Sequence, residues 1–163
     1  CPVSITYSTQ IVKLAASLGI EIPILGGDTL DSNMVLEAAA GSDVQLYVST
    51  FYQEGGSPEF DEGFKAWLSE DSTAMTNNGG NDTIAAVTAM GYDAYYVALE
   101  ALKAAGSTDK AAVKAALPDV TYTGVSGSIA FDEQGDAIRD TAYIKTADTA
   151  NNAWTLETVQ TVE

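Results

Sequence analysis

The chain has 163 residues, which is enough for one domain or for parts of two. It carries 7 basic and 23 acidic residues, a net charge of −16, and no histidine. Binding to nucleic acid or to anionic lipid needs clustered lysine and arginine, but Arg139 is the single arginine here, among scattered lysines. A histidine-dependent hydrolase, a Cys–His protease and the usual zinc sites are also excluded, and we expect no metal and no cofactor.

The composition is that of a folded chain, with 46% hydrophobic and 18% charged residues. No apolar run is long enough to span a bilayer, and any export signal is expected to lie outside this sequence. The single cysteine, Cys1, has no internal disulfide partner, so cysteine usage does not decide the redox compartment. The acidic balance fits an extracytoplasmic surface, although many cytosolic proteins share it.

The first fifty residues alternate helices and apolar strands. A helix is expected over 7–18, strands over 22–25 and 44–51, and a short helix over 33–40. The apolar face of the first helix is assigned to Ile11, Leu14, Ala15 and Leu18. This order, with short glycine-marked loops, predicts a parallel α/β sheet whose first strand precedes residue 7 and is partly represented by 2–5.

The middle of the chain is expected to be helical, and the tail to form strands. Helices are predicted over 59–68, 83–105 and 110–117, with a polar loop over 72–82. The apolar stripe of the longest helix is assigned to Ile84, Val87, Met90, Ala94, Val97 and Ala101. In the tail, strands are predicted over 124–131, 141–146 and 154–162, with a turn over 132–136.

Gly26-Gly27-Asp28 is the most informative short element, because it places a carboxylate just past the end of a parallel strand. Ligands of open α/β sheets bind at that edge, and an ionised aspartate accepts hydrogen bonds from an ammonium group. Asp28 therefore either holds the amino group of a small ligand or only braces its loop. The element is neither a dinucleotide fingerprint nor a phosphate loop.

Other polar clusters have simpler explanations. Asp132, Glu133 and Asp136 lack the spacing of an EF-hand and fit a solvated turn. Hydroxyl residues around Ser4 and Thr6 can bind an anion at the start of a helix, or can merely cap that helix. No pair of acid and base, and no activated nucleophile, is visible, so an enzyme is not expected.

Four ordered stretches resemble the second half of type 1 periplasmic binding proteins, the substrate-binding components of branched-chain amino-acid ABC importers. They are Leu18-Gly-Ile-Glu-Ile-Pro-Ile-Leu-Gly-Gly-Asp-Thr-Leu-Asp-Ser32, Val48-Ser-Thr-Phe-Tyr52, Gly91-Tyr-Asp-Ala-Tyr-Tyr96 running on to Ala104-Ala-Gly-Ser107, and Gly124-Val-Ser-Gly-Ser-Ile-Ala-Phe-Asp-Glu-Gln-Gly-Asp136. The resemblance implies an incomplete α/β fold of this type: a parallel sheet with flanking helices and a C-terminal β-hairpin. It also implies two lobes that close on a ligand about a hinge. Residues 1–50 would belong to lobe two, 51–118 to lobe one, and 119–163 would return to lobe two.

The resemblance also implies site residues and partners. Asp28 matches the carboxylate that holds the ligand's α-amino group in the family. Ser4, Ile5 and Thr6 match a ligand-contacting segment in which an aromatic is frequent, and Val87 matches a contact near the start of the long helix. The partners would be a small amino-acid-like ligand and a membrane permease, in an extracytoplasmic setting, with a lipid anchor conceivable in the full-length protein.

Family members have a long N-terminal half that holds the ligand carboxylate, and none of it precedes Cys1. We therefore expect a fragment, with Cys1 arising from truncation rather than lipidation. The alternatives are a ligand-sensing receptor domain of the same fold, or a fragment that mainly self-associates as a homo-oligomer because its helices have lost their cover.

Overall fold

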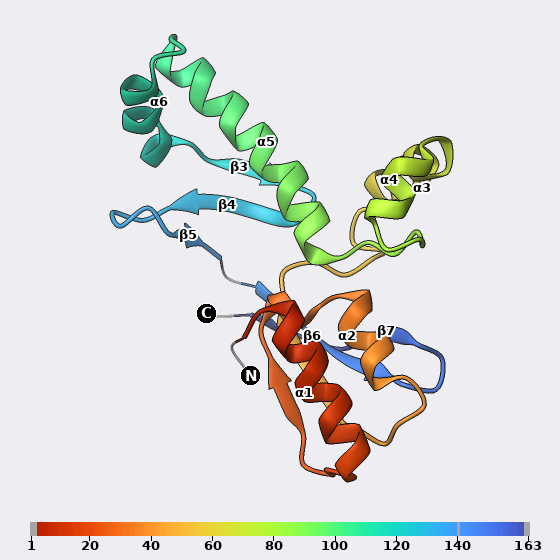
Figure 1. Cartoon of the computed structure of the whole chain (residues 1–163). Coiled ribbons are helices and arrows are strands. Elements are labelled where there is room, and N and C mark those ends of the chain that lie inside the picture. The colour runs from red at the N-terminus through yellow and green to blue at the C-terminus, as the bar shows by residue number, and fades with distance from the viewer. Residues whose placement is uncertain (1–2, 140, 162–163) are drawn as a thin grey trace.

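The computed structural model describes residues 3–139 and 141–161, which form two units joined by two crossings of the chain (Figure 1). The sheet unit comprises residues 3–50 and 141–161, and the helical unit comprises residues 58–138. The chain leaves the sheet unit through residues 51–57 and approaches it again at Arg139. The expectations for Cys1 concern a residue outside the described part of the chain.

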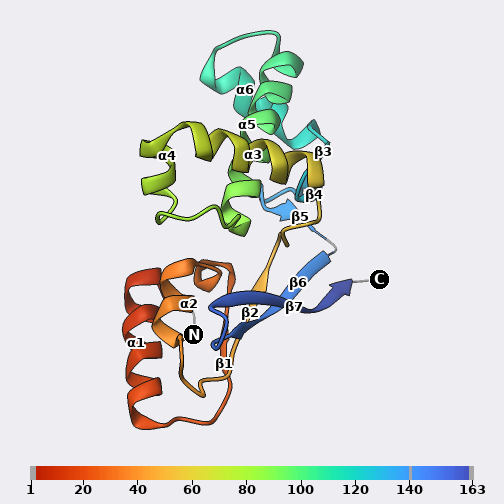
Figure 2. The ribbon, with the colours of Figure 1, turned by 90° about the vertical axis from the view of Figure 1, so that its right-hand side faces the viewer.

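The sheet unit has a four-stranded sheet in the order β1-β2-β6-β7. β1 and β2 are parallel, whereas β6 pairs antiparallel with β2 and forms a hairpin with β7. The two helices lie on one side of this sheet (Figure 2) and pack on it through a core that includes Val12, Val35 and Leu46. The elements are α1 (Ile5–Leu18), β1 (Ile24–Gly26), the short 3-10 helix η1 (Asp28–Leu30), α2 (Asn33–Ala39), β2 (Leu46–Thr50), β6 (Thr141–Asp148) and β7 (Ala153–Thr161).

The helical unit contains a second, antiparallel sheet in the order β3-β4-β5. Residues of α5, β3 and β4 share a core with Val97, Ala101, Val120 and Ile129 at its centre. A separate cluster around Tyr52 and Ile84 joins the first crossing to α3 and α5. The elements are α3 (Pro58–Glu70), α4 (Ser72–Asn77), α5 (Ala86–Ala105), α6 (Lys110–Ala116), η2 (Leu117–Asp119), β3 (Tyr122–Gly124), β4 (Gly127–Phe131) and β5 (Ala137–Ile138).

The two crossings lie against each other. The Arg139 guanidinium carbon stands 5.2 Å from the ring centroid of Phe51, in cation–π geometry. The same guanidinium donates hydrogen bonds to the carbonyl and hydroxyl oxygens of Ser126, at 2.9 and 3.1 Å. A side-chain hydrogen bond from Asn33 to Asn81, 2.7 Å long, provides a second link between the units. Among the described residues, no helix is long and apolar enough to cross a membrane.

Most predicted elements are found, with four differences. The strand expected at 2–5 is absent from its described part, because Ile5 already begins α1. The loop expected at 72–82 starts with a helix, since the Asp71 side chain accepts from the N–H groups of Thr73 and Ala74. The sheet that contains β1 is mixed rather than wholly parallel. Residues 119–138 pack with α5 and α6, and pairing with β2 begins only at Tyr143; the assignment of lobes remains a prediction.

Candidate functional site

The loop that carries Asp28 begins where β1 ends and is shaped by a close approach at Gly26. A Cβ at Gly26 would lie 2.4 Å from the Leu30 side chain, so only glycine fits. Leu30 is fully buried in the core of the sheet unit. Asp28 opens the single turn η1, closed by a hydrogen bond from the Asp31 N–H to the Asp28 carbonyl. A buried leucine and a glycine thus fold the chain sharply and leave Asp28 at the strand end, as predicted.

The Asp28 side chain is half-buried and has no hydrogen-bond or ion-pair partner among the described residues. An ionised carboxylate that no protein group neutralises is ready to accept an ammonium group. The start of the chain lies beside it, because the Thr29 hydroxyl donates to the Val3 carbonyl at 3.3 Å. The local braces of the loop are made by other residues, so nothing found here uses the Asp28 carboxylate itself.

Ser4, Ile5 and Thr6, which the family resemblance names as ligand contacts, lie at the start of α1, close to η1. Ser4 is the N-cap residue, but its side chain makes no capping bond; its carbonyl accepts from the N–H and hydroxyl of Ser8. All three residues are exposed. The first turn of α1 therefore presents uncapped N–H groups next to the Asp28 loop.

Val87 lies in the first turn of α5 and is 58% exposed. In both ribbon views the start of α5 faces the end of the sheet unit from which α1 begins (Figures 1 and 2). The start of α5 and the start of α1, which carry predicted site residues, thus face each other. The expected apolar stripe of α5 is right at Ile84, Val97 and Ala101, which are buried, and wrong at Val87 and Ala94, which are exposed. The other buried positions of the helix are Ala86, Ala89 and Asp93.

Sequence reasoning missed a buried ion pair three residues beyond Asp28. The Lys145 ammonium lies 3.0 and 3.2 Å from the two carboxylate oxygens of Asp31, and the Thr50 hydroxyl donates to that carboxylate at 2.9 Å. The Lys145 and Asp31 side chains are only 3% and 2% exposed. Because the two partners are 114 residues apart in the sequence, no local sequence pattern predicts the pair.

A second buried carboxylate, Asp93, was also missed. It accepts hydrogen bonds from the N–H groups of Val125 and Ser126, at 2.9 and 2.8 Å, and from the Ser126 hydroxyl. Gly124 packs directly against it, since an added Cβ would lie 2.1 Å from an Asp93 oxygen. Asp93 therefore fixes the turn between β3 and β4.

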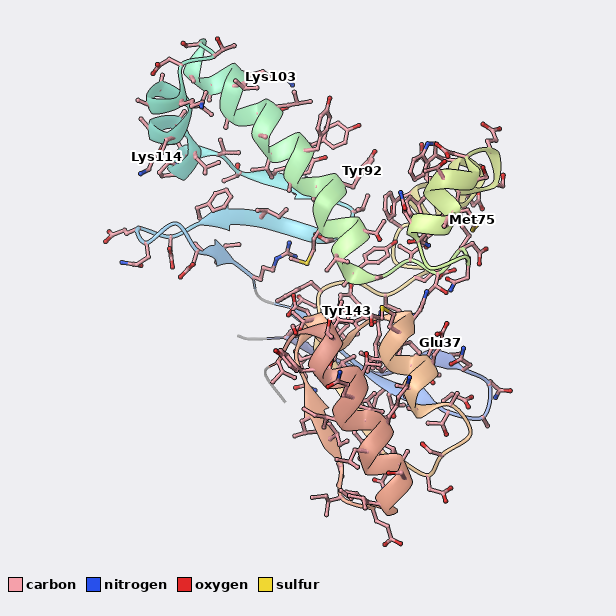
Figure 3. All side chains as sticks on the ribbon, viewed as in Figure 1. Glu37, Met75, Tyr92, Lys103, Lys114 and Tyr143 are labelled. Carbon is pink, nitrogen blue, oxygen red and sulfur yellow. The ribbon has the colours of Figure 1, made fainter. Side chains whose placement is uncertain are left out.

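An open aromatic groove of about 550 Å³ lies between α3 and α5. Figure 3 shows Tyr92 extending from α5 toward α3. Its ring centroid lies 4.9 Å from that of Phe60, and a hydrogen bond to the Tyr96 hydroxyl raises the pKa of Tyr92 to about 12. Trp67 is half exposed at the groove. The groove is separate from the Asp28 loop.

The acidic turn has the role that the sequence predicted. The Asp132 carboxylate accepts from the N–H groups of Gln134 and Asp136, at 2.9 and 2.8 Å, and so closes its own turn. Within the described ranges 3–139 and 141–161, no group of three metal-ligating side chains is found.

Two units joined by neighbouring crossings, with a carboxylate at the carboxyl end of a parallel strand, are an arrangement typical of hinged solute-binding proteins. A family model described as "Periplasmic binding protein" matches residues 5–152, and the chain belongs to this family. The expected family and fold class are therefore confirmed. The family consists of binding proteins rather than enzymes, as predicted, and its name favours an extracytoplasmic location. A comparison with curated proteins returns no significant relative.

Solved structures agree with the family. The leucine-binding protein LivK from Thermotoga maritima is 26% identical with a TM-score of 0.76, and the match covers 98% of this chain and 43% of that one. A substrate-binding protein from Desulfitobacterium hafniense complexed with Leu is 26% identical at TM-score 0.60, covering 94% and 41%. LivJ from Streptococcus pneumoniae, in complex with isoleucine, shares the fold at 21% identity and TM-score 0.70, covering 99% and 43%. The chain thus spans less than half of these proteins.

Proposed function

We propose that this chain supplies the C-terminal half of the substrate-binding component of an amino-acid ABC importer of the branched-chain type. Asp28 holds the ammonium group of a small zwitterionic ligand, and the ligand carboxylate is held by an N-terminal half. Closure of the two units about their crossings then encloses the ligand. The partners are a membrane permease and that N-terminal half, and the location is extracytoplasmic.

One observation carries the proposal. Asp28 is the carboxylate at the carboxyl end of a parallel strand, and no protein group described here neutralises it. The placement of Ser4, Ile5 and Thr6 beside its loop, and of Val87 on the facing helix, supports the same location. Two relatives at 26% identity, the leucine-binding protein of Thermotoga maritima and the Desulfitobacterium hafniense protein complexed with Leu, bind leucine, which supports the ligand class.

The test separates the two charged groups of the ligand. In NMR titrations of this chain, 3-methylbutylamine, which is leucine without its carboxylate, should shift the amide signals of Gly27, Asp28 and Thr29 at millimolar concentration. 4-Methylpentanoate, which lacks the ammonium, should not. Asp28→Asn should weaken amine binding about tenfold or more, because a charge-assisted hydrogen bond contributes about 1.5–3 kcal/mol.

Asp43→Asn is the matched control, because Asp43 is an exposed aspartate of the same unit, outside the Asp28 loop. It removes the same charge and should leave amine binding unchanged. The proposal fails if the amine shifts no signal near Asp28, or if D28N and D43N weaken binding equally. Micromolar binding of leucine in calorimetry would contradict the proposal that this chain holds only the ammonium group of the ligand, since the groups that hold the carboxylate are assigned to the N-terminal half.

A further inference from the structure

We propose that the buried cluster of Asp31, Lys145 and Thr50 positions Asp28 for the ligand. The cluster fixes the turn η1 to the sheet, so that the Asp28 carboxylate stays at the strand end without a brace of its own. This inference rests on the proposed function and names the residues that prepare its site.

The cluster joins three separate parts of the sheet unit. Asp31 follows η1 directly, Thr50 ends β2, and Lys145 lies in β6. Both carboxylate oxygens of Asp31 are used, one of them twice, by the ammonium and the hydroxyl. Thr50 is fully buried, as the two charged side chains nearly are. Water therefore competes little for these bonds, and their geometry is well defined.

Fixing Asp31 also fixes Asp28. The Asp31 N–H donates to the Asp28 carbonyl, and the Leu30 N–H donates to the Gly27 carbonyl, both at 3.0 Å. Between these bonds Leu30 is anchored in the core. The turn is thus held at its end by the ion pair and at its middle by a buried leucine. Asp28 keeps only the rotations of its own side chain.

The position of Lys145 is set by the regular antiparallel pairing of β6 with β2. Lys145 stands opposite Val48, a residue of the buried core, where an apolar side chain would pack without desolvating a charge. Buried ion pairs often add no stability over apolar replacements, which favours a geometric role for this one.

The experiment replaces the pair and follows the turn by NMR. Asp31→Leu with Lys145→Met removes both charges together and leaves neither one buried alone. We expect a denaturation midpoint close to that of the wild type. The Leu30 amide should exchange with solvent at least tenfold faster than in the wild type, whereas the Leu46 and Val48 amides stay protected. Binding of 3-methylbutylamine should weaken at least tenfold.

A gentler pair of variants decides the matter if the double variant does not fold. Thr50→Val removes one hydrogen bond to Asp31 and should speed exchange at Leu30 about threefold. Thr146→Val is its matched control: Thr146, the neighbour of Lys145 in β6, donates to the Leu46 carbonyl instead, so exchange at Leu30 should not change.

Two results would overturn the inference: a folded double variant whose Leu30 exchange and amine affinity equal those of the wild type, or equal effects of T50V and T146V at Leu30. Failure of the proposed function gives a different pattern. In that case the amine binds the wild-type chain nowhere near Asp28, while the exchange comparison still decides whether the cluster holds the turn.

Discussion

Buried aspartates in this acidic chain are each satisfied in a different way. Asp31 has an ammonium partner, Asp61 accepts from the Tyr52 hydroxyl and the Gly55 N–H, and Asp93 accepts from the backbone of a turn. These three are 4%, 7% and 0% exposed. Asp28 differs from all of them, since it is more exposed and has no partner among the described residues. Asp28 is thus not among the carboxylates that stabilise the fold through buried contacts.

Asp93 gives a residue-scale prediction about stability. Asp93→Asn turns one acceptor oxygen into a donor that faces the N–H groups of Val125 and Ser126, and should lower the free energy of unfolding by about 2–3 kcal/mol. Gly124→Ala should also destabilise the fold, because the new methyl would overlap the Asp93 carboxylate. Urea denaturation followed by circular dichroism measures both changes.

The control for Gly124→Ala is Gly91, which lies on α5, the helix that carries Asp93. Gly91 has open space around its Cα, so Gly91→Ala should raise stability by up to about 1 kcal/mol through helix propensity alone. If Gly91→Ala lowered the free energy of unfolding as much as Gly124→Ala, an added methyl group would be destabilising even where no side chain is near it. The specific role assigned to the contact between Asp93 and Gly124 would then be wrong.

At the scale of elements, the first crossing is tied to the start of α3 by one hydrogen-bonded set. The Tyr52 hydroxyl donates to Asp61 at 2.6 Å and accepts from the Ser57 N–H at 3.1 Å. The other Asp61 oxygen accepts from the Gly55 N–H at 2.6 Å. Burial of the phenol, followed by its hydrogen bond to Asp61, raises the pKa of Tyr52 well above its usual value.

This shift predicts how stability depends on alkaline pH. The unfolded chain ionises Tyr52 near pH 10, whereas the folded protein keeps it protonated, so its contribution is complete below that pH and is lost as pH rises further. Tyr52→Phe should cost about 1–3 kcal/mol at pH 7. The gap between wild type and variant should narrow above pH 10 in urea denaturation curves; a gap that widens there would contradict the assignment.

Element prediction succeeded where local signals decide and failed where packing decides. Most helices and strands follow from periodicity and glycine-marked ends. α4 was missed because Asn77-Asn78-Gly79-Gly80 dominated the pattern, although Asp71 was a recognisable N-cap. On α1 the sequence contains two apolar stripes, and the structure buries the one with Val12 and Ala15. Only the position of the sheet chooses between such stripes.

In the candidate site, too, the sequence predicted the features set by neighbouring residues but not those set by packing. The position of Asp28 followed from a strand and two glycines that are adjacent in sequence. The ion pair that holds its turn did not, because Asp31 and Lys145 meet only after β6 has returned to pair with β2. A lysine in the middle of the predicted strand was the one signal available. To predict an ion pair from this lysine one must know its partner, Asp31, which lies 114 residues away in the sequence.

At the scale of the whole molecule, the second stripe of α1 leaves a row of large apolar side chains on the surface. Ile11, Leu14 and Leu18 are 41%, 58% and 65% exposed, and Tyr7 continues the row. The aromatic groove between α3 and α5 exposes more apolar surface. Such patches favour association, whereas the net charge of −16 opposes it.

We therefore predict that this chain self-associates and that salt strengthens the association, because screening weakens the charge repulsion. Sedimentation velocity over a range of concentrations measures it. Leu14→Lys with Leu18→Lys should return the chain to monomer. Gln10→Lys, an exposed polar position of α1, should have little effect. A single monomeric species at high concentration and high salt would contradict the prediction.

The order of the strands has a consequence for how the molecule can be divided. β2 and β6 are antiparallel neighbours, and Thr50 stands directly opposite Tyr143. Everything between these residues is, in topological terms, an insertion into the loop of a β-hairpin. A two-residue turn such as Asn-Gly joining the strands at that point would reconnect them without altering their register. The sheet unit could then be produced as a miniature protein.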